Sequence, residues 1–128
     1  MGNAVRETLA MELTGVHHVA LCVDDVEQAI AFYVEALGCD KRSDRPDFGF
    51  PGAWLNAGTQ QIHLMQFGAP EKSMSHFALQ IDDARAWAAH LEAQGVEHRL
   101  SPHTPGAGRQ IFLHDPAGNQ IELNQPDH

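Results

Sequence analysis

The chain has 128 residues, of which 43% are hydrophobic and 20% are charged, as in one ordinary globular domain. The net charge is −9 and the eight lysine and arginine residues are scattered, which argues against a nucleic-acid-binding face and favours attraction of a cation. No apolar run approaches the ~20 residues that a membrane span needs, and Cys22 and Cys39 form no disulfide framework, so we expect a cytoplasmic protein.

The first half of the chain predicts a strand, a helix and further strands. Apolar residues alternate with others in the first strand, whose apolar face carries Val19, Leu21 and Val23. Asp24 or Asp25 can cap the helix that follows, and a glycine after its last apolar residue is placed to end it. Prolines and glycines then break the chain into short extended pieces. The strands predicted in this half are 15–23, 53–55 and 61–67.

The second half predicts the same order of elements. Asp83 begins a helix that extends to Gln94, where Gly95 stops it. The run Asp115–Asn119 has the turn chemistry expected before a final strand. The strands predicted in this half are 75–81, 96–100, 110–113 and 120–124. Each half therefore predicts a βαβββ module.

The two halves also repeat each other in sequence, and the repeated positions hold metal-binding side chains. The segment His18–Asp25 returns 58 positions later as His76–Asp83, with five of eight residues identical. A second repeat, at an offset of 59, places His63 where the later copy has Glu122. Repeated units of this kind dock on one another, so the four residues should be related by a pseudo-two-fold axis.

The alternation of the strands predicts where these four side chains point. In both first strands the apolar face should pack under the helix, so that His18 and His76 point away from it. His63 and Glu122 alternate with apolar neighbours in the same sense. We expect all four to face one concavity, and we expect His17 to point the other way as a strand-end residue.

These features resemble the vicinal oxygen chelate superfamily, which contains glyoxalase I, extradiol dioxygenases, fosfomycin-resistance enzymes and bleomycin-binding proteins. The resemblance covers nearly everything after residue 14. It implies an α+β fold, in which two pseudo-symmetric βαβββ modules curl their sheets into a metal-binding cleft. The segments that carry it are His18–Leu21 with Asp25, Ala31–Tyr33, Leu37–Gly38, His76–Leu79 and Asp115–Leu123. The implied division is an N-terminal extension at 1–14, module one at 15–67, a linker at 68–75 and module two at 76–126, which form one domain at 15–126.

The resemblance also implies one divalent metal ion, with ligands that fall on His18, His63, His76 and Glu122. Glyoxalase I-like enzymes usually have Glu where this chain has His63, so the chain departs from them there. Three neutral imidazoles and one carboxylate suit Zn, Ni, Co or Fe(II). Without His63, the other three form a 2-His-1-carboxylate set that suits non-haem Fe(II). The resemblance further implies a homodimer whose sites take ligands from both chains, with a self-contained monomer as the alternative.

The predicted function is a metal-dependent enzyme, most like glyoxalase I, a lyase or isomerase that acts on a small substrate with two adjacent oxygens. The metal would polarise a substrate oxygen while Glu122, as the base, moves a proton between adjacent carbons. His63 is the second catalytic candidate. A glutathione conjugate would need cationic partners, of which Arg109 is the best placed.

Two alternatives remain. The segment 103–122 resembles the signature of extradiol dioxygenases, but Phe112 stands where that signature has Tyr, which counts against ring cleavage. His103 and His114 could then serve in acid–base steps. A non-catalytic drug-binding protein of the bleomycin-resistance kind is the other alternative, which the filled ligand positions disfavour. Fosfomycin chemistry would need a cluster of cations that the sequence lacks. The side chains predicted to line the substrate pocket are Trp54, Met65, Phe67, His103, Arg109 and Phe112.

Overall fold

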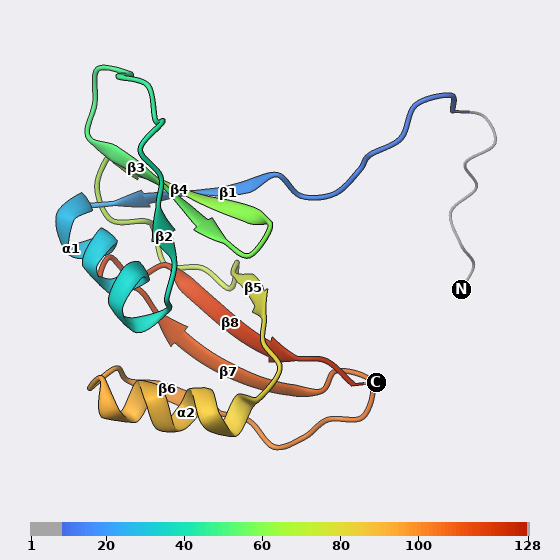
Figure 1. Cartoon of the computed structure of the whole chain (residues 1–128). Helices are drawn as coiled ribbons and strands as arrows, with labels where there is room; N and C mark the ends of the chain where they lie inside the picture. Colours follow the sequence, from blue (N-terminus) through green and yellow to red (C-terminus); the bar gives the residue numbers. More distant parts are fainter. Residues whose placement is uncertain (1–8, 128) are drawn as a thin grey trace.

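Each half of the chain forms the same succession of elements in the computed structural model, which describes residues 9–127 (Figure 1). The first half comprises β1 (His18–Val23), α1 (Val26–Ala31), the π-helical turn η1 (Phe32–Ala36), β2 (Asp40–Lys41), β3 (Gly52–Ala57) and β4 (Gln60–Gln66). The second half comprises β5 (Phe77–Gln80), α2 (Ala84–Ala93), β6 (His98–Leu100), β7 (Arg109–His114) and β8 (Gln120–Gln125). The predicted α+β fold of two βαβββ modules is confirmed.

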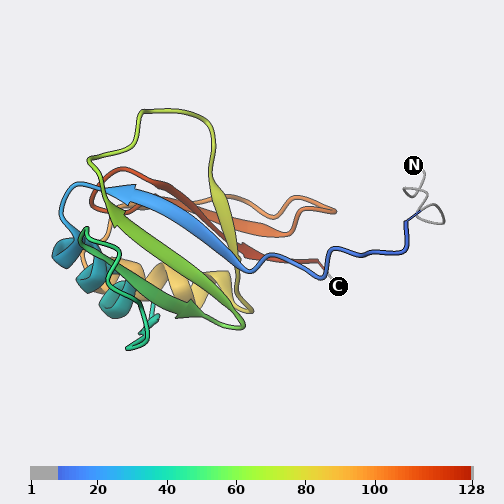
Figure 2. The same ribbon diagram turned by 90° about the horizontal axis from the view of Figure 1, so that it is seen from above.

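The two sheets share one topology. Their strand orders are β1-β4-β3-β2 and β5-β8-β7-β6. In each sheet the first strand pairs in parallel with the last, and the remaining pairs are antiparallel. Within the described part of the chain, β1 and β5 therefore each have a neighbour on one side only. Figure 2 shows that the two sheets do not close into a barrel.

The helices begin and end where the sequence predicts. The side chains of Asp25 and Asp83 accept hydrogen bonds of 3.1 Å from the backbone N–H groups three residues on. Each carboxylate thus satisfies one N–H that a helix start leaves without a partner. Gly38 and Gly95 follow the helical segments with φ of +75° and +71°, a conformation that favours glycine. The π-helical turn η1 is not predicted by the apolar spacing, which an ordinary α-helix satisfies equally well.

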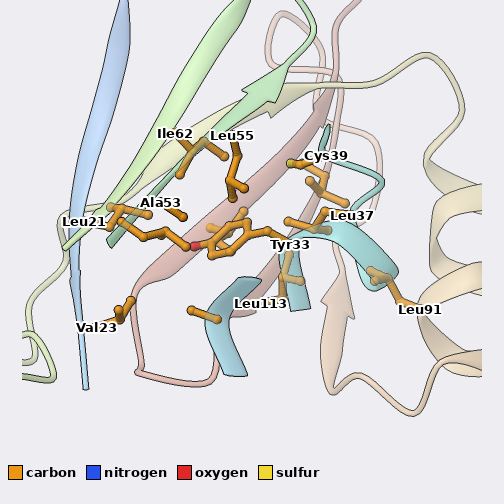
Figure 3. Close-up of a cluster of buried hydrophobic side chains, with 14 of the residues drawn as sticks. Leu21, Val23, Tyr33, Leu37, Cys39, Ala53, Leu55, Ile62, Leu91 and Leu113 are labelled. Atoms are coloured by element: carbon orange, nitrogen blue, oxygen red, sulfur yellow. The ribbon is translucent and has the colours of Figure 1, made fainter. Parts of the chain in front are cut away.

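One apolar core joins the two modules. The apolar faces of both sheets contribute to it, as the alternation of Leu21 and Val23 predicts, and Tyr33 lies in its middle with no exposed surface (Figure 3). The largest fully buried side chains are Tyr33, Leu55, Ile62, Leu64, Leu91, Ile111, Ile121, Leu123 and Val23. The opposite faces of the sheets are left to the polar side chains of the candidate site.

Some boundaries differ from the prediction. The first strand begins at His18 rather than at residue 15, and residues 9–17 form an arm that leads away from the sheets (Figure 1). The segment 40–57 contributes two strands rather than one. Residues 1–8 of the predicted extension lie outside the described residues, and the division into modules at 15–67 and 76–126 remains a proposal. In the described residues no helix is long and apolar enough to cross a membrane.

Candidate metal centre

His18 and His63 lie side by side on the face of the first sheet that points away from the core. The parallel pairing of β1 with β4 puts Ala20 opposite His63, so residues 18 and 63 share a face. Their imidazole rings are stacked, with centroids 3.9 Å apart and an interplanar angle of 14°. Trp54, opposite His63 on β3, stacks on it with centroids 4.6 Å apart. His63 is therefore held between two flat rings.

This environment keeps His63 neutral. Its pKa is lowered to about 4, first by burial and next by the nearby imidazole of His18. Smaller contributions in the same direction come from His17, Arg42 and Arg45. Its Nε2 lies 2.9 Å from the side-chain oxygen of Gln61. A neutral imidazole is the form that binds a metal ion, so His63 is ready to serve as a ligand near neutral pH.

His17 also stays with this pair, contrary to the expectation that it points away. Its Nδ1 lies 2.9 Å from Nδ1 of His18, and its ring centroid is 6.4 Å from that of His63. The expectation assumed that the strand already includes residue 17. Since β1 begins at His18, the alternation of faces does not apply one residue earlier.

His76 and Glu122 form the second pair, on the second sheet. His76 Nε2 lies 3.0 Å from Oε1 of Glu122, whose carboxylate is buried. The other carboxylate oxygen accepts hydrogen bonds from the side-chain amides of Gln110 at 3.2 Å and Asn124 at 2.9 Å. The Nδ1 of His76 lies 3.1 Å from the carbonyl oxygen of Met74, which orients the ring with Nε2 toward Glu122. Such outer contacts typically fix the ligands of a metal.

The two pairs occupy equivalent places in their sheets. Both histidines of the repeat, His18 and His76, precede by two residues an alanine that is paired with the last strand. The residues paired across neighbouring strands are Ala20, His63 and Trp54 in the first sheet, and Ala78, Glu122 and Phe112 in the second. The correspondence that the repeat suggested, between His63 and Glu122, is thus found in the strand register.

The two pairs do not meet within one chain. Among residues 9–127, no group of three or more His, Cys, Asp or Glu side chains is arranged to hold a metal ion. The expectation of one concavity shared by all four therefore does not hold for a single chain. Each pair lies next to a free sheet edge, with His18 on β1 and His76 just ahead of β5. The donors themselves, imidazoles and a buried carboxylate, suit a divalent ion.

A small aromatic cavity adjoins the first pair. It has a volume of about 200 Å³ and is lined by His18 and His63, by the predicted pocket residues Trp54 and Met65, and by further residues that include Arg45, Phe48 and Phe50. The sequence did not single out the last three, because they lie in the stretch broken by prolines and glycines. The one available signal was the pair of phenylalanines between Pro46 and Pro51, with an arginine directly before Pro46.

The other predicted pocket residues are dispersed. Phe67 does not line the cavity but packs against Phe50, which does, with ring centroids 4.6 Å apart. Phe112 lies near the second pair, 6.4 Å from the ring of His76. His103 Nε2 is instead 2.7 Å from the carboxylate of Asp127, and Arg109 on β7 pairs with the end of β8. Neither His103 nor Arg109 lines the aromatic cavity, so both remain predictions without support from this geometry.

The chain is similar in sequence and in structure to several known proteins. The model of the Glyoxalase/Bleomycin resistance protein/Dioxygenase superfamily matches residues 15–123. Glyoxylase I 4 of Arabidopsis thaliana is 27% identical over 124 residues, 88% of this chain and 71% of that protein. Metallothiol transferase FosB of Staphylococcus epidermidis is 29% identical over 122 residues, 89% of this chain and 83% of that protein. The crystal structure of TnmS3, an antibiotic binding protein from Streptomyces sp. CB03234, is 31% identical, covers 91% of this chain and 99% of its own, and has a TM-score of 0.78.

Proposed function

We propose, for a chain that belongs to the Glyoxalase/Bleomycin resistance protein/Dioxygenase superfamily, the function of a metal-dependent enzyme most like glyoxalase I. It would transfer a proton between adjacent carbons of a small substrate that carries two neighbouring oxygens. In this proposal His18 and His63 of one chain and His76 and Glu122 of a second chain hold one divalent ion. A symmetric dimer would contain two such centres.

One observation carries the proposal. The two pairs are equivalent in register, both face away from the core, and both lie beside a free strand edge, yet they stay apart within the chain. In a two-fold dimer a contact from one chain to the other is repeated in reverse. The first pair of each chain can then meet the second pair of its partner. The dimer would thus contain two centres, each with four ligands.

In this proposal, different residues of the chain would bind the metal and transfer the proton. A divalent ion bound by this donor set would polarise a substrate oxygen and so acidify the neighbouring C–H. Glu122 would accept that proton and return it to the adjacent carbon, since it is the one carboxylate among the four candidates. Its amide partners, Gln110 and Asn124, hold the carboxylate in place. His63, already neutral, would act as a ligand rather than as a base.

A second function, binding of a flat antibiotic without catalysis, is favoured by a separate observation. The aromatic cavity presents Trp54 and Phe48 beside the first pair, and the antibiotic binding protein TnmS3 is 31% identical to this chain. Metal content separates the two functions. An enzyme of the proposed kind retains a near-stoichiometric divalent ion, whereas a binding protein needs none.

The decisive experiment mixes two disabled chains. His18→Ala damages the first pair and His76→Ala damages the second, so each homodimer should lack metal and activity on a glutathione hemithioacetal. When the two variants are refolded together, each mixed dimer has one intact centre and one doubly damaged centre. With random pairing, about a quarter of the wild-type metal content and activity should return.

The matched control mixes His18→Ala with His63→Ala, which damage the same pair. No centre is intact in any dimer of these two chains, so nothing should return. Failure of the first mixture to recover metal, while wild type refolded in parallel does recover it, contradicts a centre shared between chains. Absence of metal from wild type purified without chelator would contradict the proposed enzymatic function itself.

A further inference from the structure

The cavity beside the first pair contains an arginine that the metal centre does not use. The guanidinium carbon of Arg45 lies 5.2 Å from the ring centroid of Phe48 and 5.1 Å from that of Phe50. Contact with two aromatic rings fixes a guanidinium in orientation and compensates part of its lost hydration. Arg45 is half-buried in the cavity wall. It is therefore a positioned cation rather than a mobile surface one.

The charge of Arg45 has no anionic partner in the structure. One of its terminal nitrogens, Nη2, donates a hydrogen bond of 3.0 Å to the carbonyl oxygen of Phe50. Between residues 9 and 127 its other N–H groups have no hydrogen-bond acceptor and no carboxylate pairs with it. Arg42, three residues earlier, is different, because two of its nitrogens donate to the carboxylate of Asp44 at 2.9 and 2.7 Å. Of these two neighbouring cations, Arg45 alone is available to an incoming anion.

Gly52 lies against the backbone of Leu64 and the guanidinium of Arg45. A Cβ atom built on Gly52 would lie 2.6 Å from Nη2 of Arg45, closer than real side chains approach one another. Gly52 has no left-handed φ that would require glycine. Its lack of a side chain is therefore explained by the close approach of its neighbours, and the guanidinium is one of them.

Aromatic surface surrounds this cation. Phe48 and Trp54 have ring centroids 6.1 Å apart, and Trp54 is stacked on His63. Phe48 is 51% exposed and Phe67 is 63% exposed, although both are large apolar side chains. Exposed apolar side chains that gather around a cavity typically mark a binding site. The volume of about 200 Å³ is below that of most complete ligand pockets, so this cavity suits one ring of a ligand.

We propose that the cavity binds a carboxylate that carries a flat aromatic ring, with the carboxylate on Arg45 and the ring against Phe48 and Trp54. Arg45 is thus a specificity-determining residue, and the inference rests on the proposed function in that the cavity adjoins the metal centre. A planar guanidinium donates two parallel hydrogen bonds to a carboxylate, which a lysine cannot do. Neighbouring rings favour a flat group through offset stacking.

The test uses protein stripped of metal with a chelator, so that its outcome does not depend on the metal centre. Three matched probes separate the contributions of the negative charge and of the flat ring to binding. Phenylacetate has both, phenylacetamide lacks the charge, and cyclohexylacetate lacks the flat ring. Binding is followed by the indole N–H signals of the two tryptophans in nitrogen-15 NMR spectra. Trp87→Phe assigns the remaining signal to Trp54.

Phenylacetate should move the Trp54 signal and leave that of Trp87 unchanged. Loss of a charged hydrogen-bond donor should weaken its binding about tenfold or more in Arg45→Gln, with an intermediate effect in Arg45→Lys. The matched control is Arg85→Gln, which removes an equal charge from the exposed face of α2 and should leave binding unchanged. Phenylacetamide and cyclohexylacetate should both bind more weakly than phenylacetate to wild type.

Two outcomes overturn the proposal: equal affinity for phenylacetate in wild type and Arg45→Gln, or phenylacetamide as tight a ligand as phenylacetate. A Trp87 signal that keeps its position in Arg45→Gln shows that the variant is folded, so weak binding cannot be attributed to unfolding. The proposed enzyme is judged separately by metal content. If the protein binds phenylacetate but wild type purified without chelator retains no metal, the proposed enzymatic function is contradicted and the proposed Arg45 site still stands.

Discussion

The hydroxyl of Tyr33 donates a hydrogen bond of 2.8 Å to the carboxylate of Asp115, 82 positions later in the other half of the chain. Both residues are buried. The other oxygen of Asp115 accepts hydrogen bonds from three consecutive backbone N–H groups, those of Ala117, Gly118 and Asn119, at 2.9 to 3.0 Å. One carboxylate thus forms the turn before β8 and connects the second module to η1 of the first.

Replacing Tyr33 by Phe should therefore destabilise the protein. The ring still fills the core, but a buried carboxylate oxygen loses one of its two donors, which should lower the free energy of unfolding by about 1–3 kcal/mol. Urea unfolding followed by circular dichroism measures the change. The control is Asp44→Asn, which removes an exposed ion pair with Arg42 and should cost less than about 1 kcal/mol. Equal losses in the two variants would contradict the role given to the buried bond.

Stability should decline at alkaline pH because of two buried acids. Burial raises the pKa of Cys39 from 9.0 to about 11, and burial followed by the charge of Asp115 raises the pKa of Tyr33 above its ordinary value. Below about pH 8 both groups are protonated in the folded and the unfolded chain and have no effect on the pH dependence. Above that pH the unfolded chain releases its protons first, so the free energy of unfolding falls.

The measurement is urea unfolding at several values between about pH 8 and pH 10.5. Cys39→Ala removes one of the two acids and should flatten the decline that begins at about pH 8, although a small cavity lowers its stability at every pH. Tyr33→Phe should flatten only the later part, above the ordinary pKa of tyrosine. An identical alkaline slope in wild type and Cys39→Ala would show that this thiol does not carry the effect.

Gly52→Ala should be harmful although glycine is rarely needed in a strand. The added methyl group would overlap the carbonyl oxygen of Leu64 and the guanidinium of Arg45. Crowding of this kind destabilises proteins by about 1–3 kcal/mol. In the double variant Gly52→Ala/Arg45→Ala most of the loss should remain, because the backbone of β4 cannot give way as a side chain can. Full recovery in the double variant would mean that only the arginine is crowded.

The proposed centre predicts a specific dependence of metal content on two side chains. Wild type purified without chelator should retain a near-stoichiometric divalent ion by plasma mass spectrometry, and His63→Ala should retain less. Glu122→Gln preserves the shape of the carboxylate and should lower proton-transfer activity by about 10²- to 10⁴-fold. Iron retained in full by His63→Ala would point instead to a three-ligand centre and an oxygen-dependent reaction. His98→Ala, on the short strand β6, is the control that should change nothing.

The sequence predicted the modules well because their determinants are local. Alternation assigned Leu21 and Val23 to the core, Asp25 and Asp83 began the helices, and the repeat matched His63 to Glu122 in the strand register. Each of these features depends on residues close in sequence or on one strand pair. The first two follow from periodicity and capping, and the third follows from the repeat in the sequence.

What could not be predicted depends on packing between distant segments. Whether the two pairs meet is decided by how one sheet docks on the other, for which the Tyr33–Asp115 bond and the common core are responsible. The setting of Arg45 depends on contacts with Phe48 and Phe50 in an irregular stretch that has no periodicity to read. His17 lies on a different side from the one predicted, because the strand begins one residue after it.

The free edges of β1 and β5 have a consequence for how the protein should be handled. If each centre requires two chains, its occupancy depends on protein concentration, and dilution below the dissociation constant would leave half-centres with two donors each. Activity would then be lost on dilution and regained with second-order kinetics. A divalent ion or a bound substrate that bridges the chains would slow the loss, since a ligand of the assembled form shifts the equilibrium toward it. Assays above and below that dissociation constant would thus sample different species.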